Sequence, residues 1–269
     1  MNYAVIYCVA CFVLCTVSIA RKFNSGNIEC MGVDVLNITK KQLFGVFFTF
    51  LAITFLLPTL LRSLLKALPL NFNLSNANLD LVAGGISHFA LLGFIIFIYK
   101  KLHLKKVNQS WTFILKEGLS CFGTALPIVL LTSCLWLAFL LFLNKCGLKI
   151  PINEQGSVVL FTKLSGFLPK FLFSVMVVVL APIVEELVFR GGLYRVFRKE
   201  LKCGAAAILT SVIFATLHFS AMSLLPLCVF SILLAKSYDR FGNIWVPIVV
   251  HSAFNCNSLI LIMLFQPQI

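Results

Sequence analysis

Runs of apolar residues long enough to cross a bilayer recur along the whole chain. A transmembrane helix needs roughly 20 such residues, and lipid offers no partner for backbone polar groups outside the segment itself. Hydrophobic residues make up 60% of the sequence, more than the core of a soluble domain requires. The sequence therefore predicts an all-α, polytopic membrane bundle of about eight transmembrane helices. The predicted spans are Tyr3–Ala20, Phe44–Leu61, Leu81–Tyr99, Leu119–Leu143, Leu168–Phe189, Gly204–Phe219, Ser223–Ala235 and Ile244–Phe265, the seventh being short.

Positive charge is concentrated in alternate connections between these spans. The net charge is +13, but the lysines and arginines lie at the ends of apolar runs, which argues against a nucleic-acid partner. The odd-numbered connections hold sixteen of the 22 Lys and Arg residues, and the even-numbered connections hold six. The positive-inside rule places the odd-numbered connections in the cytoplasm. We expect a multi-pass protein of a cytoplasmic (inner) membrane or its equivalent, with both termini on the non-cytoplasmic side.

Three charged residues interrupt one of the most apolar runs. Glu185, Glu186 and Arg190 lie within or directly after FLFSVMVVVLAPIVEELVF. A carboxylate at membrane depth costs about 2.5–3.5 kcal/mol on translocon scales, so such groups usually pair, line a wet cavity or do chemistry. Glu186 and Arg190 are four residues apart on one helix face and are predicted to form an ion pair. Glu185 points away from that pair, which makes it the candidate general base.

Two histidines and an asparagine occur at matching depth in later spans. Glu185 and His218 are almost symmetric about the turn near 201–204, so two antiparallel helices place them at one level. His251 lies at a similar depth, and Asn255 shares its helix face. Alone, each polar residue is more often a structural contact between helices, as we expect for His88 in the third span. Together, they predict a catalytic cavity.

These residues form three motifs that resemble a known family. Glu185-Glu186-x-x-x-Arg190, Phe214-x-x-x-His218 and His251-x-x-x-Asn255 are similar to the signature of the CAAX protease and bacteriocin-processing family. This family, also called the abortive-infection family, consists of intramembrane proteases and includes the type II CAAX prenyl endopeptidase. The resemblance covers about 168–264, while the first four spans match only as generic hydrophobic helices. We expect one integral membrane domain, 1–269, with a catalytic-motif core at 168–264.

The resemblance implies a membrane endopeptidase whose cavity opens toward the cytoplasm. Glu185 would activate water, and His218, His251 and Asn255 would complete the site, with Glu186, Arg190 and Phe214 in support. Two descriptions of the chemistry stay open. In one, Zn²⁺ is held by Glu185, His218 and His251 and lowers the pKa of bound water, which is the family's usual description and the one favoured here. In the other, Glu185 acts as base without a metal, and a histidine with Asn255 stabilises the oxyanion.

The expected substrate is a membrane-embedded or lipidated peptide or protein cleaved near the cytoplasmic face. The sequence does not identify it, and prenylated substrates do not follow from the motifs. Two other functions are compatible with the same residues. One is a non-catalytic immunity or scaffold protein of the same fold, and the other is a transporter or proton relay that uses membrane Glu and His residues. The sequence shows no inverted repeat that would favour transport.

Overall fold

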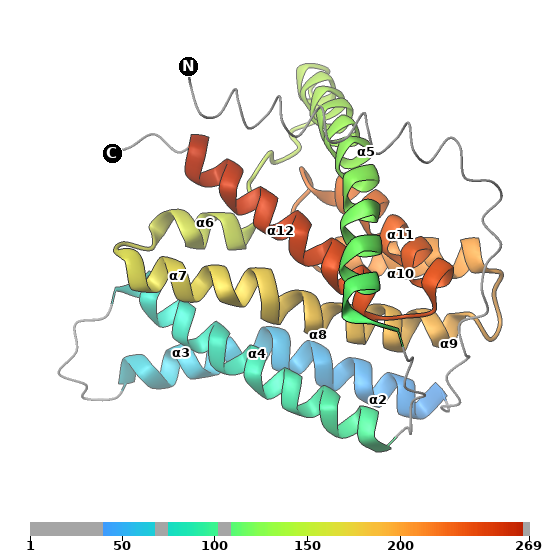
Figure 1. The fold of residues 1–269 in the computed structure, drawn as a ribbon. Coiled ribbons are helices and arrows are strands. Elements are labelled where there is room, and N and C mark those ends of the chain that lie inside the picture. The colour runs from blue at the N-terminus through green and yellow to red at the C-terminus, as the bar shows by residue number, and fades with distance from the viewer. Residues whose placement is uncertain (1–39, 68–74, 102–108, 266–269) are drawn as a thin grey trace.

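The computed structural model describes residues 40–67, 75–101 and 109–265, and these residues form helices and connections with no strand among them. The predicted all-α class is confirmed. The predicted span Tyr3–Ala20 lies outside the described residues. The elements are α2 (Lys40–Leu51), η1 (Ala52–Leu56), α3 (Leu57–Ala67), α4 (Asn76–Lys101), α5 (Trp111–Lys145), α6 (Gly156–Lys163), α7 (Phe167–Val175), η2 (Met176–Leu180), α8 (Ala181–Val188), η3 (Phe189–Tyr194), α9 (Arg195–Phe197), α10 (Cys203–Thr216), α11 (Leu224–Phe241) and α12 (Trp245–Phe265) (Figure 1).

Five helical segments of the described chain are long and apolar enough to cross a membrane. They are Phe44–Ala67, Asn76–Ile98, Trp111–Lys145, Phe167–Phe197 and Trp245–Phe265. The protein is therefore an integral membrane protein. Helix α10 has 14 residues, which at 1.5 Å per residue is about 21 Å and short of a bilayer core of about 30 Å.

Several helices extend beyond the predicted spans: α4 begins at Asn76 instead of Leu81, and α11 ends at Phe241 instead of Ala235. Helix α5 begins at Trp111 instead of Leu119, because the Ser110 side chain accepts a hydrogen bond from the backbone N–H of Phe113 and so caps the helix. The short helix α6 was not predicted, since its eight residues carry no span-length apolar run.

The segment that carries the adjacent glutamates is one long helix with two π-helical turns. Elements α7, η2, α8, η3 and α9 follow one another without a break from Phe167 to Phe197. Pro182 lies at the start of α8, directly after the π turn η2, where its missing N–H is accommodated by the change in hydrogen-bond register. Glu185 and Glu186 thus lie on a short α-helical stretch between two π turns, which in other proteins often mark functional sites.

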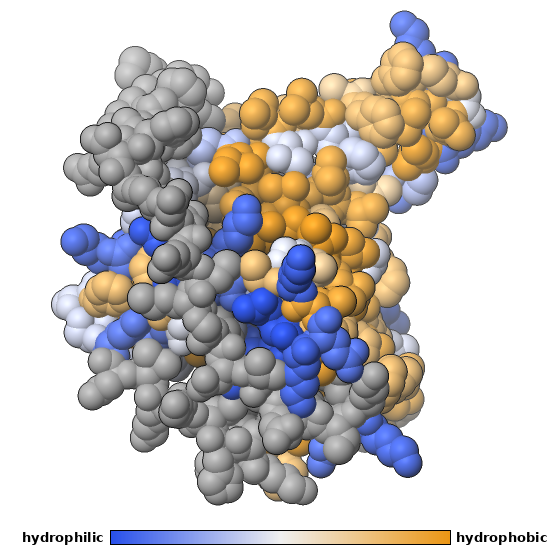
Figure 2. All heavy atoms as spheres, turned by 90° about the vertical axis from the view of Figure 1, so that its right-hand side faces the viewer, coloured by the Kyte–Doolittle hydropathy of each residue, from blue (hydrophilic) through white to orange (hydrophobic). Residues whose placement is uncertain are grey.

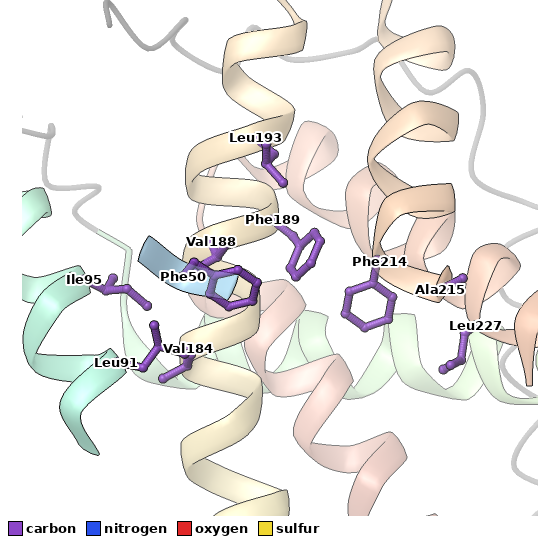
Figure 3. Close-up of a cluster of buried hydrophobic side chains, with 10 residues drawn as sticks. All are labelled: Phe50, Leu91, Ile95, Val184, Val188, Phe189, Leu193, Phe214, Ala215 and Leu227. Atoms are coloured by element: carbon purple, nitrogen blue, oxygen red, sulfur yellow. The ribbon is translucent and has the colours of Figure 1, made fainter. Parts of the chain in front are cut away.

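An aromatic cluster fixes this helix against its neighbours. The Phe189 ring meets the Phe214 ring edge-on at 5.0 Å between centroids, and it meets the Phe50 ring at 5.9 Å on its other side. Figure 3 shows Phe189 between Phe50 of α2 and Phe214 of α10, with Val184 below it on the same helix. These side chains are almost fully buried. The cluster therefore holds η3 between α2 and α10 and sets the position of the glutamates one turn away.

Helix α5 approaches α12 closely at Gly118. A Cβ atom added there would lie 2.6 Å from Cγ1 of Val249, a distance that real side chains do not adopt. Gly118 therefore permits the contact that keeps α12, the helix of His251, in place.

The bundle has two chemically different ends. One end is formed by the start of α2, by α9, by the turn into α10 and by the turn between α11 and α12; we call it the basic end. It carries Arg195, Arg198, Lys199, Lys202 and Arg240. The start of α5 belongs to it, since the Gln109 side chain donates to the backbone oxygen of Phe241. Figure 2 faces this end and shows hydrophilic side chains gathered beside a hydrophobic surface.

The opposite end is formed by α3, the start of α4, α6, the start of α7 and the end of α12 (Figure 1). Arg62 of α3 pairs with Asp80 of α4 at 2.8 Å, and Ser220 donates to the backbone oxygen of Asn153. The first contact joins α3 to α4, and the second places the turn after α10 beside the connection that follows α5.

Candidate active site

A fully buried ion pair lies at the centre of the candidate site. Arg190 Nη1 donates to Glu186 Oε1 at 2.9 Å, and both side chains have no exposed surface. The predicted pairing of these residues is confirmed. Arg190 Nη2 also donates to the backbone oxygen and the hydroxyl of Ser231 in α11. A buried charge persists only when it is paired and hydrogen-bonded, and this network meets both conditions.

His251 bridges the two glutamates. Its Nδ1 lies 2.9 Å from Glu186 Oε1, and its Nε2 lies 3.9 Å from Glu185 Oε2. Because a carboxylate accepts, Nδ1 carries the hydrogen, and the neutral ring presents a lone pair on Nε2 toward Glu185. Glu186 thus holds the tautomer and orientation of His251, a contact that the sequence did not predict.

His218 lies just beyond the end of α10. The helix ends at Thr216, and Phe219 follows His218 with a left-handed φ of 48°, an uncommon conformation for a bulky residue. His218 Nδ1 donates to the backbone oxygen of Phe214 at 2.8 Å. Its Nε2 therefore also carries a lone pair when the ring is neutral.

Phe214 contacts three members of the site. Its ring centroid lies 4.7 Å from that of His218 and 6.0 Å from that of His251, and the Arg190 guanidinium lies 5.1 Å above its face. The ring is fully buried. Phe214 therefore packs against both imidazoles and supplies a cation–π contact to the central arginine.

A cavity of about 720 Å³ joins the predicted residues, since Glu185, His218, His251 and Asn255 all line it. Asn255 donates from Nδ2 to the backbone oxygen of Val177 in η2, at 2.9 Å. Within the described residues, Glu185 Oε2 has no hydrogen-bond partner although it is buried. The Glu185 side chain as a whole is 24% exposed, so a molecule bound in the cavity is able to reach it.

Two contributions were not predicted. Ser231 completes the shell of Arg190 from α11, and nothing in its sequence context sets it apart from other membrane serines. His88 lines the same cavity from α4. It was expected to bond between helices, but its Nδ1 donates to the backbone oxygen of Gly84 in its own helix.

The donor chemistry and the donor geometry give different answers for Zn²⁺. Two imidazole Nε2 lone pairs and a carboxylate are suitable ligands. Among the described residues, however, no group of three His, Cys, Asp or Glu side chains is arranged to hold a metal ion. Glu185, His218 and His251 therefore form no ready three-ligand group in this arrangement, and zinc binding stays a prediction.

Comparison with known proteins identifies a family to which part of the chain is similar. The predicted family resemblance is confirmed. Residues 167–257 match the family model described as type II CAAX prenyl endopeptidase Rce1-like. This Rce1-like segment contains all seven residues of the three motifs, so the match covers the buried ion pair, both histidines and Asn255.

Two curated relatives are similar over about a third of the chain. One is the UPF0177 protein YbdI of Lactococcus lactis subsp. lactis (strain IL1403), 33% identical over 35% of this chain and 51% of its own length. The other is the candidate membrane peptidase YdiL of Bacillus subtilis (strain 168), 30% identical over 33% of this chain and 36% of its own length. The chain thus spans about half the length of YbdI and just over a third of the length of YdiL. No solved structure matches.

Proposed function

We propose that this protein is an intramembrane endopeptidase of the CAAX-protease type, with Glu185 as its general base. The observation that supports this most is the placement of Glu185 Oε2, 3.9 Å from His251 Nε2 in a cavity that His218 and Asn255 also line. That separation is too long for a direct hydrogen bond. Glu185 is therefore not held by His251 through a direct bond, and its side chain, 24% exposed, keeps part of its surface open to water in the cavity. The match of the Rce1-like segment and the name of the relative YdiL support the same class of reaction.

In the proposed reaction, one proton moves from water to Glu185 and then to the leaving group. Glu185 takes a proton from water, the resulting hydroxide attacks the peptide carbonyl carbon, and the carbonyl oxygen becomes an oxyanion. Glu185 then returns the proton to the leaving nitrogen, so that the C–N bond breaks into a carboxylic acid and an amine. Both neutral imidazoles present lone pairs, so a donor to the oxyanion must come from the Asn255 amide or a protonated histidine. Glu186 holds the His251 ring in place through Nδ1.

The walls of the cavity indicate the class of substrate. Phe173, Val177 and Leu259 are among its apolar lining residues. Such walls suit a membrane-embedded or lipidated peptide better than a hydrophilic one. The bilayer that surrounds the bundle is then both the solvent of the enzyme and the source of its substrate.

The decisive experiment compares Glu185→Gln with wild type on a library of membrane-tethered peptides in proteoliposomes. Loss of a general base lowers the rate by about 10²–10⁴-fold. Glu154→Gln, an exposed residue at the cavity rim, is the matched control and keeps wild-type activity. Equal cleavage by wild type and Glu185→Gln would remove Glu185 from the mechanism. An inactive wild type would favour the scaffold function.

The metal question has its own measurement. Because the described donors form no three-ligand group, we expect 1,10-phenanthroline to leave cleavage unchanged and the purified protein to carry less than one zinc per chain. Stoichiometric zinc, with activity lost on chelation and restored by Zn²⁺, would show that Glu185, His218 and His251 converge on a metal in the working enzyme.

A further inference from the structure

The cavity extends from the catalytic residues toward only one end of the bundle. Beyond Glu185, His218 and His251, its lining comes from the halves of the helices nearest the opposite end. These residues are Thr54, Pro58, Asp80, Gly84, Ser133 and Ile262. Glu154, in the connection between α5 and α6, and Gly156 and Ser157, at the start of α6, also line the cavity and are exposed, so it reaches the surface there.

Toward the basic end the site is closed. Arg190, Tyr194 and Phe214 have no exposed surface, and they fill the space between the catalytic residues and that end. Tyr194 also donates to Asp239 of α11, which ties η3 to the neighbouring helix below the site. The cavity lining includes no residue of α9 or of the turns that precede α10 and α12. Within the described residues, the catalytic groups are therefore reached from the opposite end.

This geometry makes two expectations from the sequence mutually exclusive. The charge distribution places the basic end in the cytoplasm, since the odd-numbered connections hold sixteen of the 22 lysines and arginines. The family resemblance places the mouth of the cavity in the cytoplasm. Because the mouth lies at the end with few basic residues, only one of these placements can hold. The lysines and arginines that favour the first placement belong to this chain, whereas the second placement comes from other proteins, so we give the charge distribution more weight.

We propose that the cavity opens to the non-cytoplasmic face of the membrane. On the function proposed above, the substrate is then a peptide whose scissile bond lies outside the cytoplasm. This is the outer end of a membrane-spanning segment or a translocated chain held at the membrane by its apolar part. A cytoplasmic lipidated tail would reach this site only after crossing the bilayer, which excludes it as substrate.

The first test uses two native cysteines. Cys146 is exposed just after α5, a helix that starts at the basic end and is long enough to cross the membrane. Cys203 is partly exposed at the start of α10, at the basic end. Intact cells are treated with a membrane-impermeant maleimide, and the labelled peptides are quantified by mass spectrometry before and after permeabilisation. We expect Cys146 to be labelled in intact cells and Cys203 only after permeabilisation. The reverse pattern overturns the proposal.

A second variant reports the cavity mouth itself. Ser157→Cys, with Lys202→Cys as its matched control at the basic end, is labelled in the same way in an otherwise wild-type chain. Labelling of Ser157→Cys from outside, at least tenfold above Lys202→Cys in intact cells, supports the proposal. Labelling of Lys202→Cys alone contradicts it.

A cleavage assay separates this inference from the proposed function. Two reporters share one apolar segment and carry the same cleavable stretch on its outer or its inner side. Outer-side cleavage that Glu185→Gln abolishes supports both proposals, and inner-side cleavage overturns the present one. If neither reporter is cleaved while Cys146 is labelled from outside, the orientation stands and the proteolytic function fails.

Discussion

The first half of the described bundle buries almost no polar side chains, whereas the Rce1-like segment buries many. Among the described residues, thirteen polar or charged side chains are buried, and twelve of them lie between Glu186 and Asn257. Ser87 of α4 is the remaining one, and it bonds to the backbone of its own helix. Helix α3 has no buried residue at all. The first helices therefore serve mainly as an apolar wall.

This difference follows from what each group of helices contacts, lipid or other helices. A helix that faces lipid needs only apolar side chains, because its backbone is satisfied internally. A helix that buries Glu, Arg and His must assemble partners from other helices before the cost is offset. The Rce1-like segment does this with Ser231 and His251, which lie 41 and 65 residues from the groups they contact. Variants of equivalent residues in the two regions test this distinction.

Two histidines that line the same cavity are expected to differ most. His251→Gln removes the imidazole that Glu186 orients beside Glu185, and we expect cleavage to fall by about 10²–10⁴-fold. His88→Gln alters a residue of α4 whose Nδ1 bonds its own helix, and not one of the catalytic residues. We therefore expect the cleavage rate to change by less than about threefold. Rates in proteoliposomes check both variants. Equal losses would extend the catalytic site into α4.

The ion pairs give the next comparison. Arg190→Met leaves the fully buried Glu186 without its main partner, and we expect the free energy of unfolding to fall by about 3–5 kcal/mol. Thermal unfolding in detergent, followed by circular dichroism, measures the loss. A change of less than about 1 kcal/mol, the range of an exposed pair, would show that Glu186 is neutral in the native state.

The glycines of two helices sharpen the packing side of the comparison. Gly118→Ala places a Cβ atom 2.6 Å from Val249 Cγ1 and should cost about 1–3 kcal/mol through overpacking. Gly93→Ala in α4 meets nothing within 4 Å, so stability should stay the same or rise slightly. Unfolding temperatures of the two variants decide this. A destabilised Gly93→Ala would reveal a partner on α4.

The smallest effect is expected for the ion pair of the first region. Arg62 and Asp80 are each more than a third exposed, and Arg62→Met should change the free energy of unfolding by less than about 1 kcal/mol. The same detergent assay used for Arg190→Met provides the measurement. A loss as large as that of Arg190→Met would mean that burial does not distinguish the two pairs.

Local patterns in the sequence predicted the features that depend on neighbours along the chain. The apolar runs gave α4 and α12, and the spacing of Glu186 and Arg190 gave their ion pair. The contact between Glu186 and His251 could not be predicted, because it depends on how α8 and α12 rotate against each other. The bond from Asn255 to Val177 depends in the same way on the π turn η2. The direction of the cavity depends on the packing of all helices together.

The two π turns around Glu185 bear on how relatives of this chain should be aligned. Each π turn holds one residue more than the α register, and each residue turns a helix by about 100°. Because the wider turn absorbs its extra residue, deleting a single residue from Met176–Leu180 would let that stretch revert to regular winding, with the side chains on both sides kept on their faces. One-residue gaps before the Glu-Glu pair therefore denote a local rewinding rather than a lost catalytic site.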